Sequence, residues 1–224
     1  MVLLWVVGYG AVYTAAQWLS SSVPVGGLIV SGLMAAYCVL LFLWSWRYNR
    51  EKNICLNAVN WKKLIKDPAI LSLLLLPMYN LMTGGYVEHS VQKIVLILSV
   101  ALIEELFFRG YLLNYLKNQG RLLAVIASSA IFALMHGANF CAGMELRYVL
   151  MQMLTAFLTG ICYGTVTLRQ GSLVPGIAAH FLTNITADKM AVCGFALFII
   201  AEGIWCFWFC YDIWKKERQD ETVY

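Results

Sequence analysis

The chain has 224 residues, of which 61% are hydrophobic and only 12% are charged, and its mean hydropathy is +0.72. A soluble domain carries about 25% charged residues, so the composition excludes an ordinary soluble fold. The formal net charge of +4 comes from basic residues between apolar runs. Basic residues in such positions set membrane topology. We therefore predict a membrane protein with the lipid bilayer as partner and no nucleic-acid partner.

Eight apolar runs follow one another and predict an all-α fold, a polytopic integral membrane helical bundle of about eight transmembrane helices. The runs cover residues 3–19, 25–46, 69–83, 94–116, 122–138, 148–168, 172–187 and 190–214. A span needs about 20 residues, so the third and seventh runs are short for a complete crossing. The first run lacks the positive start of a signal peptide and is counted as a span. No repeat or flexible linker divides the chain, so residues 1–224 are predicted to form a single membrane domain.

The basic residues fall mainly on one side of these runs. If all eight runs cross, twelve lysines and arginines share the side of Met1, and only Lys93, Arg147 and Lys189 lie on the other. The positive-inside rule then places both termini in the cytoplasm. The basic loop 47–68 is either an interfacial helix with Trp61, Leu64 and Ile65 on its apolar face, or an ordinary cytoplasmic loop. The seven cysteines show no CxxC spacing and are interpreted as small hydrophobic residues.

Three charges lie inside the fourth apolar run. Between Ile94 and Leu116, only Glu104, Glu105 and Arg109 are charged. A charge at the bilayer centre costs roughly 2.5–3.5 kcal/mol, so such residues mark functional sites. Spacing of four residues favours an ion pair between Glu105 and Arg109, while Glu104 is rotated about 100° away on the helix. One carboxylate is therefore expected to be held by a cation and the other to be available for chemistry.

Two histidines also lie at membrane depth. His136 follows Phe132 by four residues, and His180 precedes Asn184 by four, so each pair shares one helix face. Contact between these clusters and the glutamates is feasible, because the fourth run descends and the fifth returns. His89, in a short polar loop, is given no role. For Glu202 in the last run we expect snorkelling or an interhelical hydrogen bond.

Glutamate and histidine in a wet cavity allow two mechanisms. In the first, Glu104 is a general base that activates water with the help of His136, while His180 and Asn184 donate to the developing oxyanion. In the second, Glu104, His136 and His180 bind a zinc ion that activates the water. The spacing differs from His-Glu-x-x-His and Asn is a poor zinc ligand, which favours the metal-free version. No Gly-x-Ser-x-Gly sequence is present, and no cysteine has a histidine one turn away.

The segments 104–109, 132–136 and 180–184 read Glu-Glu-Leu-Phe-Phe-Arg, Phe-Ala-Leu-Met-His and His-Phe-Leu-Thr-Asn. In order and spacing they resemble the motifs EExxxR, FxxxH and HxxxN of the CPBP family, the CAAX proteases and bacteriocin-processing enzymes also called Abi proteins. The resemblance covers a catalytic core of approximately residues 90–188. It implies that Glu104 is the catalytic glutamate and that His136 positions the water.

The resemblance further implies that Glu105 with Arg109 orients the site, and that His180 and Asn184 bind a second water or the oxyanion. Family members are described both as glutamic and as metalloproteases, so zinc stays an open alternative. We therefore expect an intramembrane endopeptidase in a bacterial cell membrane, with a site open to the cytoplasm or inner leaflet. Its expected substrate is a hydrophobic or lipidated peptide or protein. The alternative is a non-catalytic bacteriocin self-immunity protein or a transporter, although no repeated halves favour the latter. The sequence predicts no particular oligomeric state.

Overall fold

The computed structural model describes residue 8 and residues 26–52, 55–83, 90–141, 143–186 and 195–221. The first predicted run, apart from Gly8, and His89 lie outside these residues. The helices are α2 (Gly26–Lys52), α3 (Trp61–Lys66), α4 (Ala69–Met82), α5 (Val91–Glu105), the π-helix η1 (Leu106–Leu112), α6 (Leu113–Leu116), the 3₁₀ turn η2 (Lys117–Gln119), α7 (Arg121–Met135), α8 (Ala138–Cys141), α9 (Leu146–Gln170), α10 (Val174–Thr186) and α11 (Phe195–Glu221).

These helices confirm the predicted all-α membrane bundle but not the count of eight spans. Within the described residues, four helices are long and apolar enough to cross a membrane: α2, α7, α9 and α11. The runs singled out as short form α4, with 14 residues, and α10, with 13. At 1.5 Å per residue each is about 20 Å long, which is less than the bilayer core of about 30 Å.

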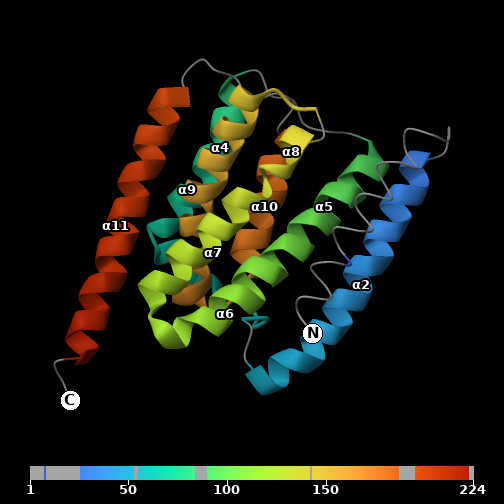
Figure 1. The fold of residues 1–224 in the computed structure, drawn as a ribbon. Helices are drawn as coiled ribbons and strands as arrows, with labels where there is room; N and C mark the ends of the chain where they lie inside the picture. Colours follow the sequence, from blue (N-terminus) through green and yellow to red (C-terminus); the bar gives the residue numbers. More distant parts are fainter. Residues whose placement is uncertain are drawn as a thin grey trace.

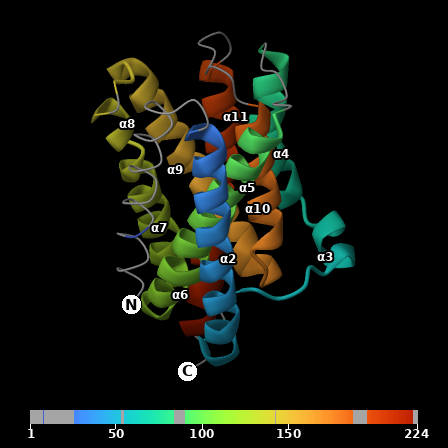
Figure 2. The ribbon, with the colours of Figure 1, turned by 90° about the vertical axis from the view of Figure 1, so that its right-hand side faces the viewer.

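The helices pack as one bundle with α2 and α11 on its two flanks (Figure 1). Helix α7 lies along α9, α10 packs against α4, α5 and α9, α11 packs against α9 and α4, and α2 covers α5. Helix α3 stands at the side of the bundle (Figure 2). Of its predicted apolar face, Leu64 is buried in the protein, whereas Trp61 and Ile65 are exposed. The basic loop therefore contains a short helix anchored by one leucine.

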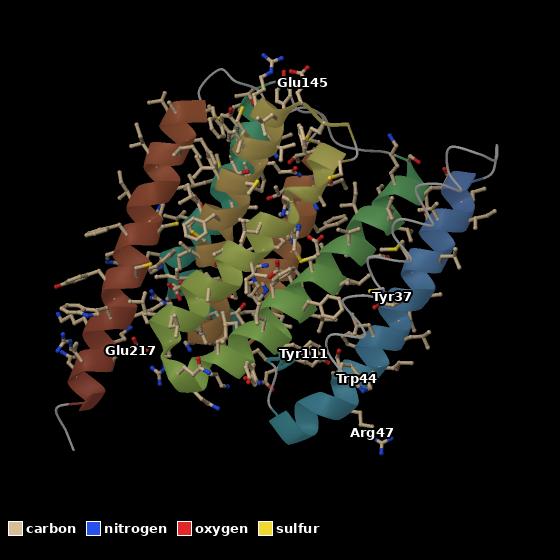
Figure 3. All side chains as sticks on the ribbon, viewed as in Figure 1. Tyr37, Trp44, Arg47, Tyr111, Glu145 and Glu217 are labelled. Carbon is tan, nitrogen blue, oxygen red and sulfur yellow. The ribbon has the colours of Figure 1, made fainter. Side chains whose placement is uncertain are left out.

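The bundle has two chemically different ends. Arg47 and Glu217 lie at one end and Glu145 at the other (Figure 3). The C-terminal ends of α2 and α11 and the α6 segment share the first end, while α8 and the start of α9 lie at the second (Figure 1). Helix α7 begins at the first end, where the backbone N–H of Arg121 donates to Glu217. It leads to α8 at the second end. We call these the Glu217 end and the Glu145 end.

The fourth run forms one uninterrupted helical stretch that changes its winding just after the glutamates. Helix α5 ends at Glu105 and the π-helix η1 begins at the next residue. Tyr111 in η1 is buried against α2, where its hydroxyl lies 2.6 Å from Ser45 Oγ and its ring stacks on Trp44 at 5.2 Å (Figure 3). π-Helical turns are frequent at functional sites, and this one connects the glutamate pair to α2.

Candidate active site

Glu105 is the centre of a buried polar cluster. Arg109 Nη1 donates to Glu105 Oε1 at 3.0 Å, and both side chains are fully buried. The i,i+4 ion pair predicted from the sequence is therefore confirmed. The same Oε1 lies 3.0 Å from His180 Nδ1, which is contributed by α10. A carboxylate can only accept, so this bond requires the proton of His180 on Nδ1. Glu105 thereby fixes the tautomer and direction of His180.

Arg109 is held by aromatic faces as well as by Glu105. Its guanidinium carbon lies 4.4 Å from the centre of the Phe132 ring and 5.6 Å from that of Tyr163. Such cation–π contacts stabilise a desolvated cation by about 2 kcal/mol. They partly replace acceptors for Nε and Nη2 of Arg109, which have no hydrogen-bond partner among the described residues. The arginine is therefore a rigid internal support.

Glu104 reaches the same histidine from the other side. Its Oε2 lies 3.5 Å from His180 Nε2, so His180 stands between the two neighbouring glutamates. Glu104 is partly exposed, whereas Glu105 is fully buried. The structure confirms that one carboxylate, Glu105, is held by a cation, while the availability of Glu104 for chemistry stays a prediction. The sequence predicts that His136 helps Glu104 to activate water, and the structure adds a contact of Glu104 with His180.

His136 joins the cluster through Phe132. Its Nδ1 lies 2.9 Å from the Phe132 carbonyl oxygen, which can only accept, so Nδ1 carries the proton and Nε2 keeps a lone pair. The Phe132 ring stands at right angles to the His136 ring at 4.7 Å and lies 5.9 Å from the His180 ring. One phenyl ring thus contacts Arg109 and both histidines.

A cavity of about 110 Å³ lies beside this cluster. It has room for about three waters at liquid density. Its described walls come from α4, α7, α9 and α10 and consist of Leu76, Asn80, Phe132, His136, Gln152, Thr155, Ala156, Thr159, Tyr163, His180, Thr183 and Asn184. Three predicted site residues, His136, His180 and Asn184, therefore face one space, and Glu104 and Glu105 are connected to it through His180.

Several residues of this site were not predicted. Asn80, Gln152 and Tyr163 line the cavity, and Asn80 donates to the Thr183 carbonyl at 3.1 Å. Asn80 and Gln152 could have been found from the sequence, because each is a polar residue within an apolar run, and such residues often mark functional sites. No sequence signal marks Gly176, where an added Cβ would lie 3.3 Å from Glu105 Oε2. Its lack of a side chain lets α10 approach Glu105.

The zinc alternative stays a prediction from the sequence. Among the described residues, no three histidine, cysteine, aspartate or glutamate side chains are arranged to hold one metal ion. The hydrogen bonds at Nδ1 of His180 and of His136 leave a lone pair on each Nε2, so these bonds do not distinguish the zinc mechanism from the metal-free one. We therefore derive no step through a metal.

The cavity lies toward the Glu145 end. His136 follows the last residue of α7, Gln152 is in the second turn of α9, and Asn184 is close to the end of α10. The charge distribution predicts that the opposite, Glu217 end is cytoplasmic. Two sequence predictions, the cytoplasmic Glu217 end and a site open to the cytoplasm, thus point to opposite ends of the bundle.

A helical membrane bundle with ionisable side chains around an internal cavity is typical of proteins that carry out chemistry within the bilayer. The family model described as Rce1-like, type II CAAX prenyl endopeptidase Rce1-like, matches residues 87–186. These residues therefore form an Rce1-like domain, which confirms the resemblance to the CPBP family, and the family and the fold together support a membrane endopeptidase. Neither the curated proteins nor the solved structures gave a match.

Proposed function

We propose that this protein is an intramembrane endopeptidase that hydrolyses a peptide bond with water activated by Glu104 and His180. The proposed substrate is a prenylated or otherwise lipidated peptide, because the Rce1-like family description refers to prenylated CAAX substrates. The observation that carries the proposal is the position of His180, 3.0 Å from Glu105 and 3.5 Å from Glu104, on the wall of a cavity with room for several waters.

The proposed reaction begins with proton transfer to Glu104. With the His180 proton on Nδ1, its Nε2 is an acceptor that faces Glu104 Oε2 at 3.5 Å, so a proton taken from water can be bound between these two atoms. A cavity water that gives its proton to this pair attacks the carbonyl carbon of the scissile bond. The proton then moves to the leaving amine as the tetrahedral intermediate breaks down.

The remaining residues have supporting roles in the proposal. The amide of Asn184 donates to the oxyanion, a contribution typically worth about 2.7–4 kcal/mol per donor. His136, whose Nε2 has a lone pair, accepts from the attacking water and fixes its direction. Arg109 balances the charge of Glu105, and Glu105 holds His180. In this assignment His180 belongs to the base and is not an oxyanion donor.

Replacement of Glu104 by Gln tests the proposal, because it keeps the shape and removes the base. Glu202→Gln is the matched control: Glu202 is a fully buried membrane glutamate on α11 that does not line the cavity. Peptides in membranes and medium are compared for cells expressing each variant at equal protein levels. We expect a cleavage product from wild type and Glu202→Gln and at least a hundredfold less from Glu104→Gln. Equal cleavage by all three would refute the mechanism, whereas identical peptide profiles without a cleavage product, with the phenotype kept in Glu104→Gln, would support the immunity alternative.

A further inference from the structure

A second and larger cavity lies at the Glu217 end, away from the candidate active site. Its volume is about 890 Å³, within the range of small-ligand sites, and none of its described lining residues lines the first cavity. Cationic side chains from five separate elements converge on it: Lys63, Lys66, Lys117, Arg121, Arg169 and Lys216. The folding of the chain, and not a basic run in its sequence, therefore brings these charges together.

The two carboxylates on the cavity wall are already paired. Asp67 accepts from Arg169 Nε at 3.0 Å and from Gln170 at 2.9 Å, and Asp212 lies 2.7 Å from the Lys216 amine. Arg169 also approaches Asp212 at 3.8 Å. The acidic groups are thus satisfied by two of the cations, and they do not neutralise the rest of the cavity.

The other cations give the cavity its positive field. Within the described part of the chain, no carboxylate forms a salt bridge with Lys66, Lys117 or Arg121. The Lys63 amine contacts the backbone carbonyl of Arg169, which leaves its charge unbalanced. Several positive groups around one space attract an anion with more than one negative oxygen, such as a phosphate.

The surroundings of the cavity favour a lipid as the source of such a phosphate. Trp61 and Ile65 on α3 are 63% and 73% exposed, next to the lysines of the same helix that line the cavity. Tryptophan beside lysine is typical of a helix at the membrane–water interface. The cavity is also formed where α7 begins and α9 ends. The ends of helices long enough to span a bilayer, such as α7 and α9, are expected at the level of the lipid headgroups.

We propose that the cavity bounded by α3, η2 and the ends of α7, α9 and α11 binds the phosphate headgroup of an anionic phospholipid. Basic pockets between membrane helices on the cytoplasmic side bind such headgroups in general. The site is separate from the candidate active site, and its test does not depend on proteolysis.

The test uses the purified full-length protein in neutral detergent micelles and measures bound lipid by native mass spectrometry, together with the thermal unfolding midpoint. Phosphatidylglycerol is titrated in one arm, phosphatidylcholine in a second, and inorganic phosphate in a third. We expect saturable binding and a rise in the unfolding midpoint with phosphatidylglycerol, and at least tenfold weaker binding of phosphatidylcholine. Equal binding of both lipids would overturn the proposal, as would an inorganic phosphate affinity that matches that of phosphatidylglycerol.

Variants then locate the site. Lys66→Gln with Lys117→Gln removes two cations of the cavity, whereas Lys62→Gln with Lys215→Gln removes two exposed lysines that do not line it. Near an anionic surface each cation changes affinity about fivefold, so we expect about 25-fold weaker phosphatidylglycerol binding for the first pair and little change for the second. Equal losses in both pairs would show general surface attraction and refute a defined site. Lys66→Arg, which retains the charge, should bind phosphatidylglycerol as tightly as the wild type does.

Discussion

Gly160 on α9 provides a direct test of how packing supports the site. An alanine Cβ there would lie 3.0 Å from Ser129 Cβ on α7 and 3.1 Å from Arg109 Nη2. Neither neighbour can move easily, because Ser129 Cβ is attached to the α7 backbone and Arg109 is held by Glu105 and Phe132. The methyl group must therefore push α7 away from α9 or displace the guanidinium.

The two opposing energies can be compared. Overpacking costs about 1–3 kcal/mol, and replacing glycine with alanine in a helix returns up to about 1 kcal/mol. We expect Gly160→Ala to lose about 1–2 kcal/mol of unfolding free energy. For a chain of this length that lowers the midpoint of thermal unfolding by about 2–8 °C. Displacement of Arg109 should also reduce proteolysis, because Arg109 positions Glu105 and, through it, His180.

The measurement is thermal unfolding of the purified protein in detergent, with product formation assayed below the midpoint. Gly32→Ala on α2 is the control, because an added Cβ at Gly32 has no atom within 4 Å. We expect this control to match wild type or exceed it in stability. An unchanged or higher midpoint for Gly160→Ala would refute the argument that Ser129 and Arg109 leave no room for a methyl group at residue 160.

Three further predictions concern buried charge and accessibility. Arg109→Gln should lower the unfolding free energy by about 3–5 kcal/mol in denaturant titrations, because Glu105 is left buried without a cation; a loss below 1 kcal/mol would contradict this. Asp67→Asn should cost about 1.5–3 kcal/mol in the same assay, since charge-assisted bonds to a buried carboxylate are weakened, and an unchanged midpoint would argue against that network. In intact cells, exposed Cys141 should react with a membrane-impermeant maleimide if the Glu145 end faces outside, whereas Cys55 should react slowly even in opened membranes, because burial raises the pKa of its thiol despite the opposing charge of Lys117.

The sequence predicted the features that depend on local spacing. Seven of the apolar runs coincide with helices of the structure. Such runs can be recognised from the sequence alone, because the hydropathy of a segment does not depend on its contacts with distant residues. The pair of Glu105 and Arg109 was predictable for a similar reason, since an i,i+4 relation fixes the distance within one helix. The motif histidines were identified as candidates, but their partners were not.

Features that depend on how helices pack could not be predicted. His180 contacts Glu105 across 75 positions of sequence, so the position of His180 between Glu104 and Glu105 depends on the packing of α10 on α5. From the sequence, the basic residues of the loops indicated only the membrane topology. That six of them surround one cavity follows from the packing of α3, η2, α7, α9 and α11, which the sequence does not reveal. The number of complete spans also depends on tilt and packing, and the described helices do not confirm the predicted count of about eight.

The π-helical stretch from Leu106 to Leu112 has a consequence for changes in chain length. A π turn accommodates one residue more than an α turn, so deletion of one residue within it would relax the stretch toward ordinary α-helix. The change in winding would take up the missing residue, so the helix beyond it would keep nearly its orientation, whereas a deletion in an ordinary α-helix turns everything after it by about 100°. Tyr111 could then stay near Trp44 and Ser45 while the glutamates face His180. This segment should therefore tolerate the deletion of one residue better than α9 does, a difference that a systematic library of single-residue deletions would reveal.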